Sequence, residues 1–413
     1  MLIYPEYLRI PVGPAEMSAP RLVALVLLIR ILVVRGFPGG KLNAVDALVV
    51  ALWAWTVVAQ ILAGAEFSSI TTMIGKGLDT VVMYVLARVS LSTMEDVKST
   101  AIPLVITATA LCILGTVESL TSYSIYAGLE NYRGWTWFEK PPEYRLGLLR
   151  AKASTSHYIY YGTAMVVLGG FLWGLSKLRT VGKWAVVGFV ASLVGSAASL
   201  SSGPMIAAGV LCFLITFERL TWLIKPTLIL LLAASLFIEI FSNRHFYNLI
   251  DYLALQGNTA WYRTRLIEVA ISRVHEYWLV GIGNESINHW GKLIDGRKHV
   301  DVVNNYIIIA IQSGLLGLFL FVAAHALAIR KAIVAFKDSS EATHGRMIFG
   351  WSACILAVDA ASMSVGLFGP PLLISYLLLG SLVSACDLQT EQDITYWIHS
   401  TEAIGDAVSI ASD

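Results

Sequence analysis

The chain has 413 residues, of which 56% are hydrophobic and only 14% are charged, and its formal net charge is +1. Proteins that bind nucleic acid concentrate basic charge on one face, so this balance argues against a nucleic-acid partner. Apolar stretches of about 20 residues recur along most of the sequence, as bilayer-spanning helices require. The sequence therefore predicts an all-α, polytopic membrane protein with one integral membrane domain over residues 1–413, in contact with the lipid bilayer.

About eleven segments, within a range of about 10 to 12, are predicted to be transmembrane helices. They cover residues 19–35, 45–64, 70–88, 99–118, 157–176, 183–200, 204–220, 222–242, 303–329, 345–365 and 367–386. One set of short loops contains many Lys and Arg residues, whereas the connections around Glu66, 199–204 and 364–371 contain none. This asymmetry predicts that the Lys- and Arg-rich loops are cytoplasmic.

Two long loops, residues 119–156 and 243–302, fall on the non-cytoplasmic side. Loops of this length are usually functional or disordered, and their Trp, Tyr and Arg content is not typical of disorder. The C-terminal segment 387–413 has six acids and no Lys or Arg, and we expect it to be a cytoplasmic tail. Function is therefore expected in the two long loops.

Metal and disulfide chemistry is not indicated. Four cysteines lie within or at the end of apolar segments, without CxxC spacing: Cys112, Cys212, Cys354 and Cys386. This pattern predicts neither a disulfide nor a zinc site. No DxD or HExxH motif occurs in the long loops and no Walker motif occurs anywhere in the sequence, so we expect no metal, no cofactor and no ATP hydrolysis.

Cations and imidazoles gather at three places on the non-cytoplasmic side: EYRLGLLRAKASTSHYIYYG (143–162), WYRTRLIEVAISRVHEYWLVGIGNESINHW (261–290) and HVDVVNNY (299–306). Converging guanidinium groups suit a phosphate or diphosphate, because each offers a planar fork of donors that is always charged. Two simpler interpretations remain open. Each arginine can reach lipid phosphates from a helix end, and Asp301 or Asn304 can cap the helix that follows.

The order of SLSSGP (199–204), YRTRLIE with WLVGIG, and NNYIIIAIQSGLLGLFLF resembles the O-antigen ligase and polymerase superfamily of bacterial membrane glycosyltransferases. Within it, RAKASTSHYIYYG and HVDVVNNYIIIAIQSGLLGL look most like exopolysaccharide polymerases. The resemblance covers roughly residues 145–330 and the number of spans. It implies a metal-independent, inverting enzyme of the GT-C type in the bacterial inner membrane, with its active site facing the periplasm.

The resemblance implies an undecaprenyl-diphosphate-linked glycan as both donor and acceptor, and allows a chain-length co-polymerase as a partner. Its arginine before the second-loop helix falls on Arg263, and its first-loop Arg and His fall on Arg150 and His157. Together with the charge pattern, this gives diphosphate-binding candidates Arg145, Arg150, Arg263 and Arg265, substrate-binding candidates His157, Tyr262 and Tyr306, and catalytic candidates His299, Asp301 and Asn304.

The sequence departs from the family pattern at two positions. Asn304 matches the Asn of the ligase-type His-Asn pair, but Val303 stands where the His is expected. Either His299 or Asp301 then supplies the general base from the loop, or this subfamily works without that imidazole. Ser202 stands where the family often has an arginine.

The expected function is polymerisation of lipid-linked repeat units into exopolysaccharide or O-antigen. A ligase that transfers finished glycan to a lipid A core or to a protein is the nearest alternative, and a secondary transporter is a more remote one. Acids within the predicted spans are few, with Asp79, Glu239 and Asp359 the clearest, which argues against a proton relay.

Overall fold

The computed structural model describes residues 2–5, 8–12, 15–35, 42–126, 142–243, 245, 248, 257–283, 286–339 and 341–388. The described chain is largely helical, with two short antiparallel hairpins. One hairpin pairs β1 (Arg9–Val12) with β2 (Ala15–Ser18), and the other pairs β3 (Tyr144–Arg145) with β4 (Leu148–Leu149).

The helices fall in the order that the apolar segments predict. The N-terminal half contains α1 (Ala19–Arg35), α2 (Ala44–Leu62), α3 (Phe67–Asp79), α4 (Val81–Ser90), α5 (Met94–Ser99), α6 (Ala101–Thr121), α7 (Tyr158–Leu175) and α8 (Gly182–Ala198). The C-terminal half contains α9 (Ser202–Thr216), η2 (Thr221–Leu223), α10 (Ile224–Phe241), α12 (Gly257–Ser272), η4 (Val274–Glu276), η5 (Ile287–Leu293), α13 (Asn305–Asp338), α14 (Ala342–Ala361) and a last helix, Pro370–Leu388.

Seven of the described helices are long and apolar enough to cross a membrane, with α3–α4 and α5–α6 each counted as one. The protein is therefore a multi-pass membrane protein. A helix covers each of the predicted spans, but α1, α8, α9 and α14 are not among the seven. The number of eleven spans thus stays a prediction.

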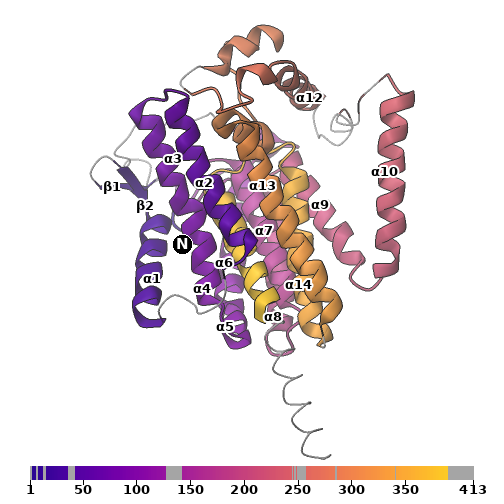
Figure 1. Cartoon of the computed structure of the whole chain (residues 1–413). Coiled ribbons are helices and arrows are strands. Elements are labelled where there is room, and N and C mark those ends of the chain that lie inside the picture. The colour runs from indigo at the N-terminus through magenta and orange to yellow at the C-terminus, as the bar shows by residue number, and fades with distance from the viewer. Residues whose placement is uncertain are drawn as a thin grey trace, which may run out of the picture.

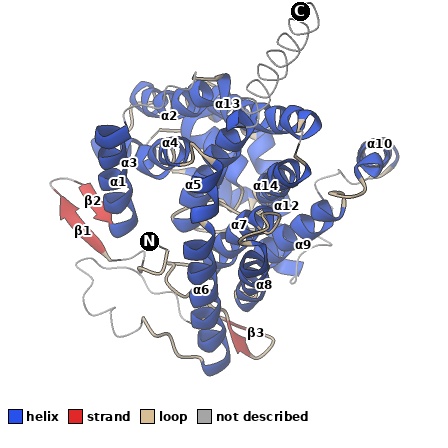
Figure 2. Ribbon diagram, turned by 90° about the horizontal axis from the view of Figure 1, so that it is seen from below, coloured by secondary structure: helices blue, strands red, loops and turns tan. Residues whose placement is uncertain are grey.

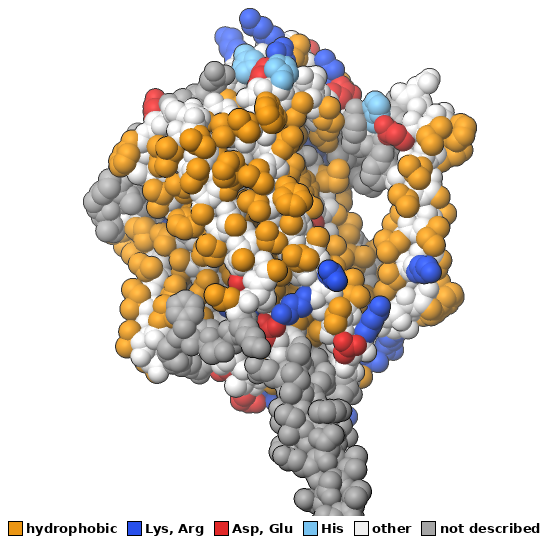
Figure 3. Space-filling view, viewed as in Figure 1, with side chains coloured by type: hydrophobic (Ala, Val, Ile, Leu, Met, Phe, Trp, Pro, Cys, Tyr) orange, Lys and Arg blue, Asp and Glu red, His pale blue; other side chains and the backbone are white. Residues whose placement is uncertain are grey.

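The helices pack side by side into a bundle with two ends, which we call the α12 end and the α5 end after the helices that lie there (Figure 1). Hydrophobic side chains cover the middle of the face seen in Figure 3, and most charged side chains on that face lie toward the two ends. This distribution is what a bilayer requires of a spanning protein. Both long loops contain structure: the first holds the β3–β4 hairpin, and the second holds α12, η4 and η5.

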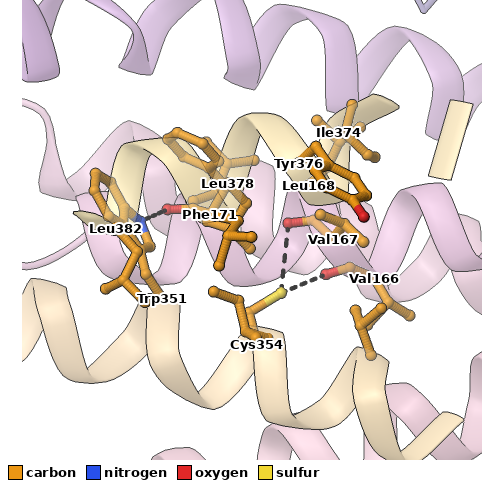
Figure 4. Close-up of a cluster of buried hydrophobic side chains, with 14 of the residues drawn as sticks. Val166, Val167, Leu168, Phe171, Trp351, Cys354, Ile374, Tyr376, Leu378 and Leu382 are labelled. Atoms are coloured by element: carbon orange, nitrogen blue, oxygen red, sulfur yellow. Dashed lines mark hydrogen bonds between the residues drawn. The ribbon is translucent and has the colours of Figure 1, made fainter. Parts of the chain in front are cut away.

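The centre of the bundle is formed by α7, whose residues are mostly buried, and by α14 and the last helix beside it (Figure 4). A Cβ atom at Gly170 would lie 2.2 Å from the sulfur of Cys354, and one at Gly174 would lie 2.3 Å from Nε1 of Trp351. These two glycines therefore let α7 and α14 approach closely, as small residues do between membrane helices. The indole of Trp351 donates a 2.9 Å hydrogen bond to the carbonyl oxygen of Phe171.

At the α5 end, cations and carboxylates are paired. Arg88 binds Asp46 at 3.0 Å and Asp387 at 2.7 Å. The hydroxyl of Tyr84 donates to Asp46 at 2.6 Å, and Lys331 binds Asp387. We call these five residues the Asp46 network; it links α2, α4, α13 and the last helix by charge.

α13 is broken at Gly314, whose backbone has φ 69° and ψ −177°. Tyr306 and His325 lie on either side of the break and would be about 28 Å apart along a straight helix. Yet the hydroxyl of Tyr306 donates to the carbonyl oxygen of Asp359 at 2.9 Å, and His325 binds the carboxylate of Asp359 at 2.7 Å. The first part of α13, residues 305–313, therefore folds back against the second part, residues 315–338.

The broken ends are bound by groups far away in the sequence. Trp55 and Gln60 of α2 donate to the carbonyl oxygens of Ser313 and Gln312 at 2.7 Å each. The amide of Ile282 donates to the carbonyl oxygen of Ile311, and the amide of Leu315 donates to that of Trp278. Backbone groups that a continuous helix would satisfy are thus satisfied by other segments, which non-helical backbone inside a membrane protein requires.

α10 stands apart from the bundle (Figures 1 and 2). Within the described chain, none of its residues is buried, and leucine, isoleucine and phenylalanine side chains cover it. An apolar helix with this exposure is suited to contact with lipid on most of its surface.

Candidate functional site

The candidate site lies where the N-termini of α7, α9 and α13 meet at the α12 end. His157 precedes α7 and accepts from the Ile159 amide at 3.2 Å, and Ser201 precedes α9. The loop after α14 contacts the N-termini of both α9 and α13. A Cβ at Gly203 of α9 would lie 2.3 Å from Val365 of this loop, and the Leu367 amide donates to Asn305 of α13 at 3.2 Å. Helix N-termini have free amides and a positive dipole end, so this region favours an anion.

Three arginines converge on the turn that begins α9. The guanidinium of Arg145 donates to the carbonyl oxygen of Leu200 at 2.8 Å, and that of Arg150 donates to the hydroxyl of Ser201 at 2.8 Å. Arg263, from α12, donates to the hydroxyl of Ser202 at 3.2 Å. We call Arg145, Arg150 and Arg263 the arginine cluster; it brings the first long loop and the second long loop to one helix end.

Three residues in the segments around the cluster have a left-handed backbone conformation. Leu200 has φ 47°, Leu146 has φ 55° and Ala153 has φ 45°, and each lies close in sequence to a residue of the cluster or to its serine partners. The left-handed region costs a residue with a side chain about 1 kcal/mol or more. Part of the cost at Ala153 is offset because its amide and that of Lys152 donate to the Glu118 carboxylate at 2.6 and 3.1 Å.

Three positive charges lie close enough in the cluster to repel one another. Glu143 binds Arg150 at 2.6 Å and accepts from the hydroxyl of Tyr158 at 2.8 Å, and the Tyr158 ring lies 3.3 Å from the Arg150 guanidinium carbon. Arg150 pairs with Glu143, whereas Arg263 has no ion pair among the described residues. Burial opposes ionisation of Glu143, but bonds from Tyr158 and Arg150 outweigh it and lower the pKa of that carboxyl.

Arg150 and Arg263 are 8% and 4% exposed, and the Nε atom of each is buried without a hydrogen-bond partner in the described structure. Burial, followed by repulsion from Arg145 and Arg150, lowers the pKa of Arg263 to about 10. Burial and the charge of Arg150 also lower the pKa of Arg145. A bound anion would relieve both effects, because it pairs with the charges and uses the free donors.

Arg265, which the sequence predicted for the same site, is not part of the arginine cluster. Its Nε donates to the carbonyl oxygen of Leu293 at 3.0 Å, and it binds Glu268 at 2.7 Å with 40% of its side chain exposed. Successive residues of an α-helix turn by about 100°, so Arg263 and Arg265 project from nearly opposite faces of α12. The helix geometry thus separates two residues that the sequence placed together.

The two predicted tyrosines bind backbone rather than each other. Tyr262 accepts from the Asp301 amide at 2.9 Å and donates to the Asp301 carbonyl oxygen at 2.8 Å, so it fixes the backbone of Asp301 to α12. The guanidinium of Arg297 lies 4.5 Å from the Tyr262 ring. Tyr306 fixes the first part of α13 to α14 through Asp359.

The three catalytic candidates differ in their surroundings. Asn304 is 5% exposed and caps α13: its oxygen accepts from the amides of Tyr306 and Ile307 at 2.9 and 3.1 Å, and its nitrogen donates to the Met363 carbonyl oxygen at 2.9 Å. His299 and Asp301 are exposed. In the described structure, neither their imidazole nor their carboxylate has a hydrogen bond. Asn304 is therefore the cap of the helix, and Asp301 is the candidate whose backbone is bonded by Tyr262, the neighbour of Arg263 in the sequence.

Sequence reasoning missed the hydroxyls and the carboxylate that organise the site. Ser201, Ser202 and Glu143 lie in segments that attracted attention for other reasons. The two serines contact arginines 51 and 61 residues away in the sequence, whereas Glu143 contacts Arg150 seven residues away. Ser202 offers the clearest signal, because the proteins that the sequence resembles often have an arginine there; in the structure the Ser202 hydroxyl is contacted by Arg263 of α12. His325 also gave no signal, although it pairs with Asp359 inside the bundle.

Across the ranges that the structure describes, no three His, Cys, Asp or Glu side chains are placed to hold a metal ion. The predicted tail lies outside the described residues beyond Leu388.

No protein-family model matches the chain, and no curated protein matches it.

Proposed function

We propose that this protein is a membrane glycosyltransferase that uses a polyprenyl-diphosphate-linked sugar donor, and that it polymerises lipid-linked oligosaccharide repeat units. The observation that supports this proposal is the arginine cluster at the start of α9, in which the buried guanidinium groups of Arg150 and Arg263 have unused donors and Arg263 has no ion pair among the described residues. Such an arrangement suits a diphosphate, which carries more than one negative charge and several acceptor oxygens.

The proposed reaction is a single displacement. An acceptor hydroxyl oxygen bonds to the anomeric carbon of the donor, and the bond between that carbon and the diphosphate oxygen breaks with inversion. The arginine cluster stabilises the negative charge that develops on the leaving diphosphate. Arg150 and Arg263 are held by Ser201 and Ser202 before substrate arrives, so little reorganisation is needed during the reaction.

Asp301 is our preferred general base for the acceptor proton. Its backbone is bonded on both sides by Tyr262, the neighbour of Arg263, while its carboxylate is exposed. His299 lies in the same loop without an equivalent bond and is the alternative base. Asn304 fills a positioning role, because three hydrogen bonds hold its side chain at the start of α13.

A groove between α13 and α14 supports the lipid part of the proposal. It has a volume of about 450 Å³, and most of its lining is apolar, including Tyr306, Phe321, Val322, Ile329, Val334 and Leu356. The lining also contains the His325–Asp359 pair and Arg330. Its lining extends from Tyr306, near the start of α13, to Val334, near the α5 end. An apolar groove of this length is suited to part of a polyprenyl chain whose diphosphate lies at the arginine cluster.

The decisive experiment is incubation of the purified protein in lipid nanodiscs with a lipid-linked repeat unit, without added metal or nucleotide. Gel analysis should show a ladder of polymers for the wild type. The double variant Arg150→Gln, Arg263→Gln should lose the ladder, whereas Arg273→Gln should keep it. Arg273 is the matched control, because it lies in the same loop region and pairs with Glu276 at 3.0 Å, outside the cluster.

A ladder of normal length from the double variant would contradict the proposal. So would wild-type protein that produces no ladder but transports a labelled solute into vesicles. A ligase differs in one respect: with a finished lipid-linked glycan and a separate acceptor, it yields a single product instead of a ladder.

A further inference from the structure

Lys76, in the last turn of α3, is a further cation that the proposed reaction does not yet use. Its ammonium donates a 2.6 Å hydrogen bond to the side-chain oxygen of Gln312, in the last turn before the break in α13. Gln60, near the end of α2, donates to the carbonyl oxygen of Gln312. The glutamine is held by its backbone and presents its oxygen to Lys76, so the ammonium is fixed beside the break in α13.

Within the described chain, no carboxylate lies at salt-bridge distance from Lys76. Asp79, one turn further along α3, is occupied by Arg21, which binds both of its oxygens at 2.7 and 2.5 Å. By contrast, Lys177 at the α5 end binds Glu218 at 2.6 Å. An ammonium in an apolar helix whose hydrogen-bond partner is a neutral amide is expensive, and it is suited to an anion that arrives from outside.

A row of rings connects Lys76 to the arginine cluster. The ammonium of Lys76 lies 5.8 Å from the Phe368 ring, and that ring lies 5.9 Å from Tyr160. Tyr160 lies 5.4 Å from His157, which lies 3.9 Å from Tyr158, the ring against Arg150. We call Phe368, Tyr160, His157 and Tyr158 the aromatic row; it has a cation at each end.

Building on the proposed function, we infer that Lys76 binds the diphosphate of the acceptor, a second polyprenyl-diphosphate-linked saccharide, and that the sugars of this acceptor lie along the aromatic row. Ring faces stack on sugars, and the two cationic ends match a molecule whose diphosphate is at one end and whose reacting hydroxyl is at the other. The row then sets the distance between the two diphosphates, and hence the length of repeat unit that fits.

The chemistry at the two ends differs. At the arginine cluster, the donor loses its diphosphate as the new glycosidic bond forms, and the acceptor proton passes to the general base. At Lys76 no bond breaks, because the acceptor keeps its own diphosphate ester and becomes the carrier of the longer chain. Lys76 is therefore a binding residue, and its role can be measured without turnover.

The test counts diphosphates. Farnesyl diphosphate is titrated into the full-length protein in phosphatidylcholine nanodiscs, and bound molecules are counted by native mass spectrometry. The wild type should bind two per chain. Lys76→Met should weaken the second by roughly tenfold to hundredfold, the effect of losing a hydrogen bond to a charged group. The first should keep its affinity, which also shows that the variant is folded.

Two further variants separate charge from shape. Gln312→Glu keeps Lys76 but supplies a carboxylate partner, so it should also remove the second diphosphate. Lys76→Arg keeps the positive charge, so this variant should still bind the second diphosphate. The double variant Arg150→Gln, Arg263→Gln should lose the first diphosphate and keep the second.

The inference is overturned if Lys76→Met still binds two molecules, or if the wild type binds only one and loses it with the arginine substitutions alone. Wild-type protein that binds none would overturn the proposed function as well. A repeat with added phosphatidylglycerol distinguishes the source of the anion: displacement of the second diphosphate by this lipid would assign Lys76 to bilayer headgroups and overturn the inference.

Discussion

The two ends of the bundle use buried cations in opposite ways. At the α5 end, Arg88 is bound by Asp46 and Asp387, and Lys331 shares Asp387, so the Asp46 network is balanced. At the α12 end, Arg150 is bound by Glu143, whereas Arg263 has no ion pair among the described residues and is repelled by Arg145 and Arg150. Both regions hold their guanidinium groups by hydrogen bonds to side chains or backbone, so the difference lies in the charge that each leaves uncompensated.

This difference separates a structural role from a binding role. A balanced network stabilises the fold and has no charge left for a ligand, whereas an unbalanced one costs stability and recovers it when an anion binds. In the proposed function, the same residue type is structural at one end and binds a ligand at the other, and its partners decide which. Four substitutions test this comparison.

The largest effect is expected for Arg88→Met in the Asp46 network. The substitution leaves Asp46 buried and charged without its cation, which typically costs about 3–5 kcal/mol. Chemical unfolding in detergent micelles should show a loss of this size. The double variant Asp46→Asn, Arg88→Met should recover part of it, because no uncompensated charge remains. A single variant as stable as the wild type would remove the contrast between the two ends.

Arg263→Gln should act on the reaction and not on the fold. Removing a donor that stabilises the leaving group costs on the order of 10²–10³ in rate, measured as initial polymer yield. Stability should be unchanged or higher, since the repulsion from Arg145 and Arg150 is relieved. Arg265→Gln should reduce the rate by less than about tenfold, because exposed ion pairs contribute little; equal losses in the two variants would place Arg265 in the site.

Ser202→Ala should have a smaller effect. It removes the hydroxyl that positions Arg263, and one such hydrogen bond contributes about 1 kcal/mol, or roughly fivefold in affinity for farnesyl diphosphate. Titration in nanodiscs measures it. Ser196→Ala is the matched control, since the buried Ser196 hydroxyl has no hydrogen-bond partner in the described structure. A loss at Ser202 no greater than at Ser196 would mean that the serine does not position the arginine.

The smallest effect concerns a paired group in the second long loop. A bond to the Ser286 carbonyl oxygen at 2.9 Å, together with the Glu276 carboxylate at 2.9 Å, raises the pKa of His289. Its stabilising contribution is therefore fully present below the unfolded value of about 6.5 and is lost as pH rises through the higher folded value. Amide exchange of residues 274–293, corrected for intrinsic rates, should show less protection at high pH.

His289→Gln should abolish this pH dependence while leaving the arginine cluster intact. If the exchange rates of the variant still change with pH in the same way, another group causes the effect. Loss of the pH dependence in the variant would instead show that a paired loop charge at the α12 end is structural, like the paired charges at the α5 end.

Much of the fold follows from sequence because apolar length determines it. α7 is apolar on all sides and is buried, as such helices are. Arg150 and Arg263 were also predictable as neighbours of one site, from charge and from family resemblance. Arg265 was not excluded, although the period of a helix already places it about 200° from Arg263.

Other features depend on contacts that no local pattern contains. The break at Gly314 needs Trp55 and Gln60 from α2, more than two hundred residues earlier. Lys76 resembles any lysine in an amphipathic segment until Gln312 and Arg21 show which partners it has and which it lacks. Sequence reasoning proposed the ends of helices as the place of function, and the structure adds that Arg150 and Arg263 keep unused donors there.

The fold-back of α13 also has a consequence for how the protein is made. Residues 315–338 form a helix about 36 Å long, enough to cross a bilayer without the first part. Residues 305–313 instead depend on the far end of α14, through Asp359, Ser362 and Met363. These partners are synthesised later than α13 itself. The N-terminus that completes the candidate site therefore docks only after α14 has been inserted, so the site matures near the end of membrane insertion.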